Sequence, residues 1–192
     1  MRSLLFILFF ATLTATSFGQ NLKYKVINKD KVIGHLNCEK SSNGDTTEYV
    51  IKSKFKLPMK SSYSYTLECT YVGDVMQFSS VNTYINQKPR SSITTTRNGG
   101  SYEIVKDKKT SYRKGQIKYS EALIYYEEPI QHSQLYSDFT SDMKTVTSLN
   151  ENKYALKNTS NGNKSIYKYI DDTLNKAVIE FGIFNFALVL DH

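Results

Sequence analysis

The feature that most constrains the fold of this chain is a hydrophobic pattern with a period of two residues. Between 47 and 57 the odd positions are mostly apolar or small, while Glu48 and three lysines occupy even positions. Between 63 and 71 the odd positions are Tyr, Leu or Cys, and the even positions are Ser, Thr or Glu. Successive side chains of a β-strand point to opposite faces. The pattern therefore predicts strands with one buried face and one wet face.

Pairs of turn-forming residues separate these segments at short intervals. Residue types such as Asn, Asp and Gly tolerate the positive φ angles that a two-residue hairpin needs. Clear examples are Lys29-Asp30, Gly73-Asp74, Asn98-Gly99, Asp107-Lys108 and Asn161-Gly162. Strands are expected at 22–28, 31–40, 46–57, 62–72, 75–86, 91–97, 101–106, 110–119, 131–137, 142–149, 153–158, 164–171, 175–181 and 184–190.

Hairpin-linked strands pair antiparallel, and a sheet of so many strands must curl, close or split. We therefore predict an all-β fold, a strongly curved antiparallel meander that forms a closed or half-open barrel-like sheet. Helical evidence is confined to the segment 120–126, which is expected to form one or two turns that end near Pro129.

The first 19 residues have the order of a secretory signal peptide. Arg2 supplies a positive charge, residues 4–10 are apolar, and Ser17 and Gly19 occupy the −3 and −1 positions of a cleavage site. The apolar run is much shorter than the roughly 20 residues that a membrane-spanning helix needs. We predict a signal peptide at 1–19 and a single antiparallel β domain at 20–192. The protein is expected to be exported, periplasmic or secreted, and not membrane-spanning.

The charge of the chain is positive but dispersed. It contains 25 Lys and Arg against 18 Asp and Glu, a formal net charge of +7. Most of the basic residues are lysines spread along the sequence, whereas nucleic-acid-binding proteins usually concentrate arginines and aromatic residues on one face. We therefore expect no nucleic-acid partner. The oligomeric state is left open.

The two cysteines share the parity of the apolar positions in their segments, so both are expected to point inward. In a simple meander one strand separates Cys38 from Cys69, which places them about 9–10 Å apart. A disulfide rarely spans more than about 7 Å between Cα atoms. We expect two buried free thiols, with a disulfide as the alternative if the sheet curves sharply or the strands are ordered differently. His35, His132 and His192 show no ligand spacing with the cysteines, so no metal or other cofactor is predicted.

The most distinctive polar cluster runs from Tyr125 to Pro129, with His132 close behind. Burial beside aromatic rings can raise the pKa of a carboxylate and make it a general acid. This hypothesis assigns acid/base roles to Glu127 or Glu128 with His132. Adjacent residues on a strand point to opposite faces, so only one carboxylate can face a given pocket. The alternative is a strand end fixed by proline. No nucleophile motif is present, and no catalytic residue is assigned.

Three functions are compatible with these features. The first is a non-enzymatic periplasmic or envelope-associated protein that holds an apolar or amphipathic ligand, such as a lipid, in a barrel-like interior. The second is a hydrolase of envelope glycan or lipid that uses the acid/base cluster. The third is a structural or interaction module that offers a sheet edge to partner chains. The residues expected to line a ligand cavity, with core packing as the alternative, are Tyr63, Tyr65, Tyr71, Phe78 and Tyr84.

Several short segments carry a family resemblance. They are Tyr24-Lys25-Val26, Ile33-Gly34-His35-Leu36, Tyr84-Ile85-Asn86, Leu123–Pro129 and Tyr167-Lys168-Tyr169. With them the chain resembles a family of exported β-rich proteins of unknown function from Bacteroidota-type bacteria. That family tends to place Asn-Gly after the last segment, where this chain has Asp171-Asp172. The resemblance implies export and a β-rich fold. It implies no activity and no catalytic residue.

Overall fold

The chain forms one antiparallel sheet. The computed structural model describes residues 18–57, 61–160, 162–181 and 184–191. Over these residues it has 14 strands. They are β1 (Phe18–Asn28), β2 (Lys31–Asn43), β3 (Thr46–Lys56), β4 (Ser62–Val72), β5 (Val75–Ile85), β6 (Lys88–Asn98), β7 (Ser101–Lys106), β8 (Lys109–Lys114), β9 (Gln134–Tyr136), β10 (Met143–Asn150), β11 (Lys153–Asn158), β12 (Lys164–Ile170), β13 (Thr173–Phe181) and β14 (Phe184–Leu190). The all-β prediction is confirmed. Most of the expected signal peptide, residues 1–17, lies outside the described residues.

Two meanders make up the sheet, β1–β8 and β9–β14. They join where the first strand pairs with the last, with Tyr24 opposite Leu190 and Ile27 opposite Ala187. The strand order therefore runs from β8 through β1 to β14 and on to β9. Within the described residues β8 and β9 do not pair with each other, so the sheet is half-open.

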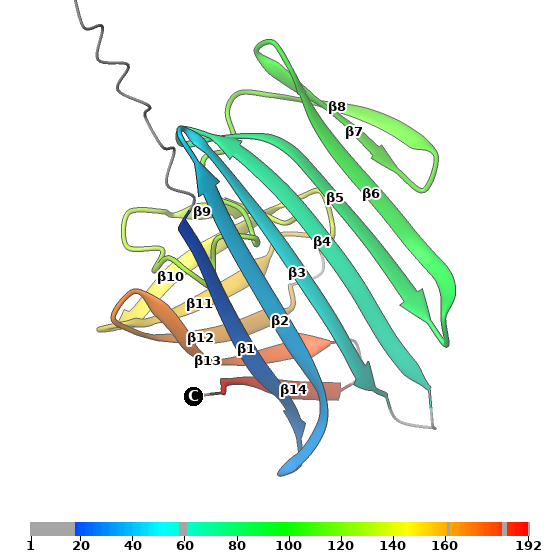
Figure 1. Ribbon diagram of the computed structural model, residues 1–192, viewed down its shortest axis with the longest axis vertical. Helices are drawn as coiled ribbons and strands as arrows, with labels where there is room; N and C mark the ends of the chain where they lie inside the picture. Colours follow the sequence, from blue (N-terminus) through cyan, green and yellow to red (C-terminus); the bar gives the residue numbers. More distant parts are fainter. Residues whose placement is uncertain (1–17, 58–60, 161, 182–183, 192) are drawn as a thin grey trace, which may run out of the picture.

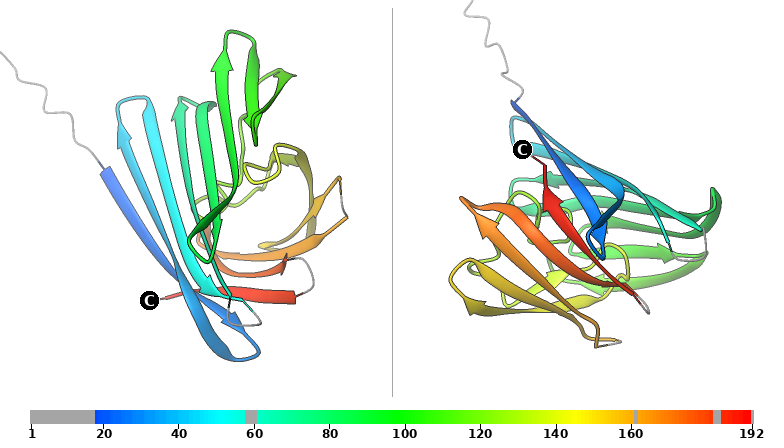
Figure 2. Two further views of the ribbon diagram at one scale, coloured as in Figure 1. Left: turned by 90° about the vertical axis from the view of Figure 1, so that its right-hand side faces the viewer. Right: turned by 90° about the horizontal axis from the view of Figure 1, so that it is seen from below.

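The sheet folds back on itself at this junction. Figure 1 shows β1–β8 as a broad layer with β9–β14 behind it. The views in Figure 2 show the two halves facing each other, with the connection between β8 and β9 lying between them. Its backbone bonds to both halves, because Met76 donates to the carbonyl oxygen of Ile117 over 2.9 Å and Leu174 donates to that of Tyr125 over 3.2 Å.

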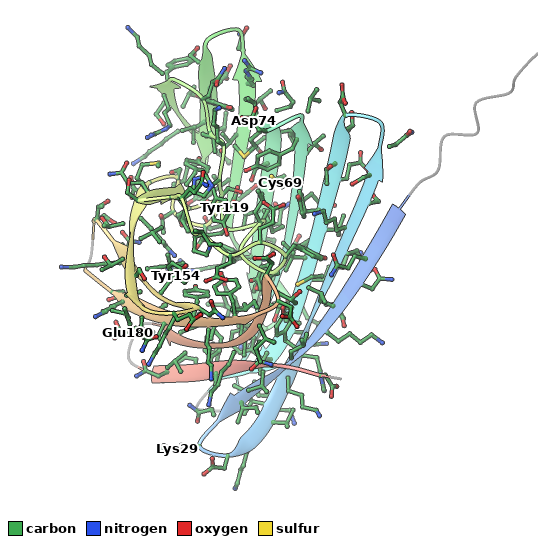
Figure 3. The ribbon with its side chains drawn as sticks, turned by 90° about the vertical axis from the view of Figure 1, so that its left-hand side faces the viewer. Lys29, Cys69, Asp74, Tyr119, Tyr154 and Glu180 are labelled. Atoms are coloured by element: carbon green, nitrogen blue, oxygen red, sulfur yellow. The ribbon has the colours of Figure 1, made fainter. Side chains whose placement is uncertain are left out.

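The hairpins are closed by tight turns whose residues have positive φ angles. Lys29 and Asp30 have φ values of 46° and 62°, and Asp171 and Asp172 have values of 47° and 60°. This geometry matches the right-handed twist of the flanking strands. Asp171-Asp172 therefore makes a two-residue turn of the same kind as the one at Lys29-Asp30. Figure 3 shows Lys29 at the tip of the first hairpin.

Linked turns, rather than a helix, occupy the segment where helical turns were expected. Leu123 donates to the carbonyl oxygen of Ser120, and Glu127 donates to that of Leu123. The run from Ser120 to Tyr126 is buried on all sides between the two halves. Other backbone groups of the run bond to sheet residues: Glu121 donates to the carbonyl oxygen of Tyr136, and the carbonyl oxygen of Tyr125 accepts from Leu174. No helix among the described residues is long and apolar enough to cross a membrane.

Alternation of burial along the strands places the core between the two halves. In β3, Ile51 and Phe55 are buried while Lys52 and Lys54 are exposed. A bulge in β5 changes this parity, because Thr70 is opposite Phe78 while Tyr71 is opposite Met76. The extra residue between Met76 and Phe78 moves the inward positions from even to odd numbers.

Cys38 in β2 and Cys69 in β4 are buried free thiols, with β3 between their strands. Figure 3 shows Cys69 on the side of the sheet that faces the interior. Burial raises the pKa of both thiols well above the ordinary value. Thiolate is the reactive form of cysteine, so both side chains are chemically protected in the folded protein.

Candidate functional site

A cavity of about 470 Å³ lies between the two halves of the sheet. Its volume is in the range of pockets that bind small molecules, about 300–1,000 Å³. Strands β2–β6 form one wall, strands β10–β14 form the other, and residues of the internal 120–126 segment contribute to the lining. Exposed Arg90 and Glu180 also line the cavity, which places part of it at the surface. Apolar side chains of the wall include Phe55, Val81, Ile93, Leu156, Ile179 and Phe186.

A chain of aromatic contacts crosses the cavity wall. Phe55 in β3 lies 5.1 Å from Phe186 in β14 and 5.2 Å from Tyr63 in β4, measured between ring centroids. Tyr65 lies 6.1 Å from Tyr63 and packs edge-on against Phe139 at 4.8 Å. Burial raises the pKa of Tyr63 to about 12 and also raises that of Tyr65. Both phenols are therefore uncharged near neutral pH, and the wall stays apolar.

Of the five residues expected to line a cavity, Tyr63 and Tyr65 do so. Tyr71 is buried deeper in the core, where it packs edge-on against Tyr49 at 6.0 Å. Phe78 and Tyr84 follow the β5 bulge and lie on the outer face of the sheet. Tyr84 borders a shallow depression there, together with basic and polar residues of β2–β4. The bulge thus explains why two of the five residues lie outside the cavity.

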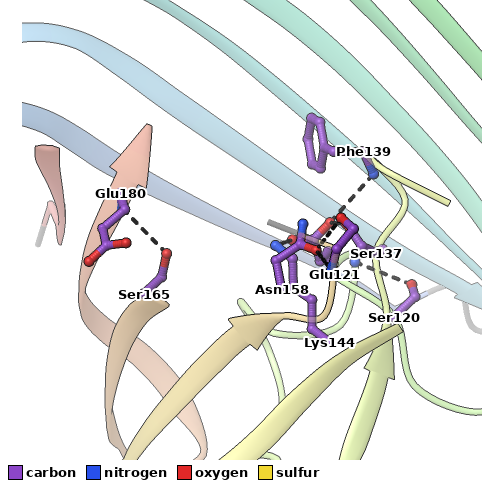
Figure 4. Close-up of polar contacts among 10 residues, drawn as sticks. Ser120, Glu121, Ser137, Phe139, Lys144, Asn158, Ser165 and Glu180 are labelled. Atoms are coloured by element: carbon purple, nitrogen blue, oxygen red, sulfur yellow. Dashed lines mark hydrogen bonds and ion pairs between the residues drawn. The ribbon is translucent and has the colours of Figure 1, made fainter. Parts of the chain in front are cut away.

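The most shielded polar region of the cavity is an ion pair. Lys144 in β10 forms an ion pair with Glu121, and the two side chains are 18% and 8% exposed. Ser137 donates a 2.7 Å hydrogen bond to the second carboxylate oxygen of Glu121, and the backbone N–H of Phe139 points to the same oxygen at 3.5 Å. Asn158 in β11 stands opposite Lys144 in the strand register. Figure 4 shows this cluster between the two halves.

A second carboxylate, Asp138, lies behind this cluster and is completely buried. Ser79 donates a 2.5 Å hydrogen bond to Oδ1, while Oδ2 has no hydrogen-bond partner among the described residues. Burial, and next the negative charge of Glu121, raise the pKa of Asp138 to about 7, although the hydrogen bond from Ser79 opposes the shift. Sequence reasoning missed both carboxylates. Glu121 had a signal, since it is the single charged residue within the buried 120–126 run.

The acid/base candidates lie apart from the cavity. Glu127 Oε1 is 3.5 Å from the Lys40 ammonium and accepts a hydrogen bond from Tyr49, and its side chain is 45% exposed. Glu128 lies on the other side, near Tyr154; burial and this carboxylate raise the pKa of Tyr154 to about 12. The two neighbouring carboxylates therefore meet different partners, but residues 127 and 128 lie in the connection between β8 and β9 and not at the end of a strand, which corrects the expectation of a strand end fixed by proline.

His132 stacks on Tyr119 with a centroid distance of 4.4 Å. Burial lowers the pKa of His132, and the nearby charge of Glu127 partly opposes this shift. His132 faces the side of Glu127 rather than a cleft shared by both carboxylates. Among the described residues no group of three or more His, Cys, Asp or Glu side chains is arranged to hold a metal ion.

Comparisons with known proteins place the chain among uncharacterised β-rich domains. Residues 24–191 match the family model described as Domain of unknown function (DUF6134). A similar solved structure is a β-barrel-like protein of domain of unknown function DUF1849 from Brucella abortus, with a TM-score of 0.54 and 10% identity over 92% of this chain and 96% of that chain. At this identity the likeness concerns the fold alone. No curated protein matches the sequence.

Proposed function

The chain belongs to the DUF6134 family of domains of unknown function, and from its geometry we propose that it is a non-enzymatic binding protein for an amphipathic small molecule such as a lipid. The observation that carries the proposal is the 470 Å³ cavity between the halves of the sheet. Its walls are mainly apolar, and its shielded ion pair is formed by Lys144 and Glu121, while the other two charged lining residues, Arg90 and Glu180, are exposed. An amphipathic molecule has the same division between an apolar body and one polar end.

The physical driving force is the transfer of apolar ligand surface from water to the aromatic wall, about 25 cal/mol for each Å² buried. The side chains of both halves are already in place, so binding requires little ordering of the protein. The N-terminal segment supports a site of action outside the cytoplasm, where a lipid-like molecule needs a carrier. The proposed function is thus that of an exported binding protein for such a molecule.

Binding of the uncharged fluorescent probe N-phenyl-1-naphthylamine to the purified protein tests the proposal. Ile179 lines the cavity, while its neighbour Val178 is 40% exposed on the other face of the same strand. We expect Ile179→Trp to fill the cavity and weaken probe binding about tenfold or more, a loss of about 1.4 kcal/mol. Val178→Trp is the matched control and should bind like the wild type. Equal binding by both variants, or no binding by the wild type, would contradict the proposal.

The hydrolase hypothesis receives less support from the geometry. Glu127 and Glu128 diverge, Glu127 is occupied by Lys40 and Tyr49, and His132 stacks on a ring. A general acid and its partner must reach one reacting bond. None of these three side chains lines the 470 Å³ cavity.

A second candidate function, an interaction module, is favoured by the free edge at β8. The β7–β8 hairpin projects from the main layer (Figure 1), and the six residues of β8 are exposed except Arg113, which is half-buried. Residues 97–118 contain seven basic and two acidic residues. An edge strand offers unpaired backbone groups, and this one would recruit an extended acidic segment of a partner protein.

Titration with a synthetic peptide of alternating Glu and Val tests this second candidate. Reversal of three charges on β8, Lys109→Glu, Arg113→Glu and Lys114→Glu, should abolish peptide binding. The matched control reverses three exposed lysines on β3, Lys52→Glu, Lys54→Glu and Lys56→Glu, and should leave binding in place. Absence of peptide binding, or equal loss in both triple variants, would exclude strand addition at β8.

A further inference from the structure

The polar region of the cavity is built around two cross-strand neighbours. Lys144 in β10 and Asn158 in β11 stand directly opposite each other, so their side chains share one face of the sheet. Both line the cavity, and so does Thr140 in the connection that precedes β10. Asn158 is only 5% exposed, and Figure 4 shows its amide close to Lys144 and Glu121.

The carboxylate oxygens of Glu121 and the amide oxygen of Asn158 already accept hydrogen bonds within the protein. One oxygen of Glu121 accepts from Lys144, and the other accepts from Ser137 and the backbone of Phe139. Oδ1 of Asn158 accepts from the backbone N–H and the hydroxyl of Ser160, over 2.9 and 2.7 Å. A backbone N–H can only donate, so this contact fixes the orientation of the Asn158 amide.

The donors, in contrast, are only partly used. The Lys144 ammonium carries three N–H groups, and among the described residues its one acceptor is Glu121. With Oδ1 of Asn158 turned toward Ser160, Nδ2 has no acceptor within the described part of the chain. The hydroxyl of Thr140 is buried and has no hydrogen-bond partner in the described part of the chain. Polar groups left unsatisfied in a buried site cost free energy, so this region favours a group that accepts hydrogen bonds.

We propose that the ligand is an acyl-chain carboxylate whose two oxygens accept hydrogen bonds from Lys144 and Asn158, with its chain along the Phe55–Tyr63 wall. The inference rests on the proposed function of the cavity. A carboxylate is an acceptor-only group, and its bonds to an ammonium are about twice as strong as neutral hydrogen bonds. A protonated amine headgroup has no lone pair to accept these bonds, and the oxygens of Glu121 that could attract it are already bonded to Lys144, Ser137 and the backbone of Phe139.

Displacement of N-phenyl-1-naphthylamine by three ligands with the same chain length tests the headgroup. Dodecanoate is expected to displace the probe at roughly tenfold lower concentration than dodecylamine, and methyl dodecanoate should fall between them. Asn158→Asp replaces the free donor by an acceptor of the same shape and keeps the Ser160 contacts. It should weaken dodecanoate binding roughly 10- to 100-fold while the uncharged probe still binds. Asn37→Asp, on the exposed outer face, is the control for net charge.

The outcomes separate this inference from the proposed function. If the probe binds but all three headgroups displace it equally, or dodecylamine displaces it best, the carboxylate assignment is wrong and the cavity function stands. The same holds if Asn158→Asp and Asn37→Asp behave alike toward dodecanoate. If neither the probe nor any of the three ligands binds, the proposed function itself fails.

Discussion

The hydroxyl of Tyr24 donates a 2.8 Å hydrogen bond to the carbonyl oxygen of Leu174, which lies 150 residues further along the chain. Tyr24 belongs to β1 and Leu174 to β13, and β14 lies between these strands in the sheet. Both side chains are completely buried, and the Tyr24 ring also contacts Tyr125 of the internal segment at 5.8 Å. One phenol therefore connects both halves of the sheet and the segment between them.

Tyr24→Phe should destabilise the protein by about 1–2 kcal/mol, because the buried carbonyl of Leu174 loses this donor while the ring remains. Urea unfolding followed by circular dichroism measures the effect. Tyr112→Phe is the control, since Tyr112 is 74% exposed and its hydroxyl is in water. The control should change the free energy of unfolding by less than about 0.5 kcal/mol. A similar change in both variants would show that the buried bond is not a stabilising contact.

Gly34→Ala should disrupt the packing of β2 on β3. Gly34 stands opposite Phe55, and a Cβ atom at this position would lie 2.1 Å from the carbonyl oxygen of Lys54 and 2.5 Å from Cα of Phe55. Because backbone atoms cannot swing away, we expect a loss of about 1–3 kcal/mol and a lower melting temperature. Gly100→Ala meets open space and serves as the control. Equal melting temperatures for the two variants would refute this account of Gly34.

Asp138 predicts a pH-dependent stability. Its pKa in the folded state, about 7, lies above the value of about 3.9 for the unfolded chain. Between pH 4 and pH 7 the folded state therefore holds the extra proton, and the free energy of unfolding falls as pH rises. The decrease is at most about 4 kcal/mol and is complete above pH 7. The charged groups beside Asp138, Glu121 and its partner Lys144, are unchanged in the two variants compared below, so they do not account for a difference between them.

Asp138→Asn removes this titration and keeps the acceptor for Ser79. Between pH 5 and pH 8 the free energy of unfolding should fall less in this variant than in the wild type. Urea unfolding of both proteins at the two pH values measures the difference. Asp45→Asn, at an exposed position, should keep the wild-type dependence. An Asp138→Asn curve parallel to that of the wild type would show that the buried carboxyl does not titrate in this range.

The thiols of Cys38 and Cys69 should be inaccessible to reagents in the folded protein and should not form a disulfide. Burial raises the pKa of Cys38 and Cys69, so the folded protein should react very slowly with a thiol reagent at pH 8. In denaturant without reductant, both thiols should react within minutes. Quantification of the released chromophore checks the number of thiols. Absence of reaction in denaturant would instead indicate a disulfide between them.

Local signals in the sequence were sufficient for the strands but not for their order. The period of two and turn pairs such as Lys29-Asp30 predicted strands close to the observed ones, because burial on one face acts residue by residue. The pairing of β1 with β14 has no local signal, since the two segments lie at opposite ends of the chain. The β5 bulge has no local sequence signal either, and it moves Phe78 and Tyr84 to the outer face.

The cavity could be predicted in part. Tyr63 and Tyr65 were found because they share the inward parity of β4. Lys144 and Asn158 were missed because each resembles an ordinary polar residue in its own segment. Only the pairing of β10 with β11, and the return of the 120–126 segment into the interior, bring them together with Glu121.

The ladder between β1 and β14 also bears on how the protein can be made. Of the 14 strands, β1 is synthesised first and its partner β14 is synthesised last, so the β1–β14 pairing cannot form until β14 has been made. A chain that stops before Phe184 lacks β14, so the backbone groups of β1 and β13 that pair with β14 would be left unpaired. Unpaired strand edges of this kind promote aggregation. Deletion of β14 should therefore lower the solubility of the protein more than deletion of the β7–β8 hairpin, which lies at the end of the sheet.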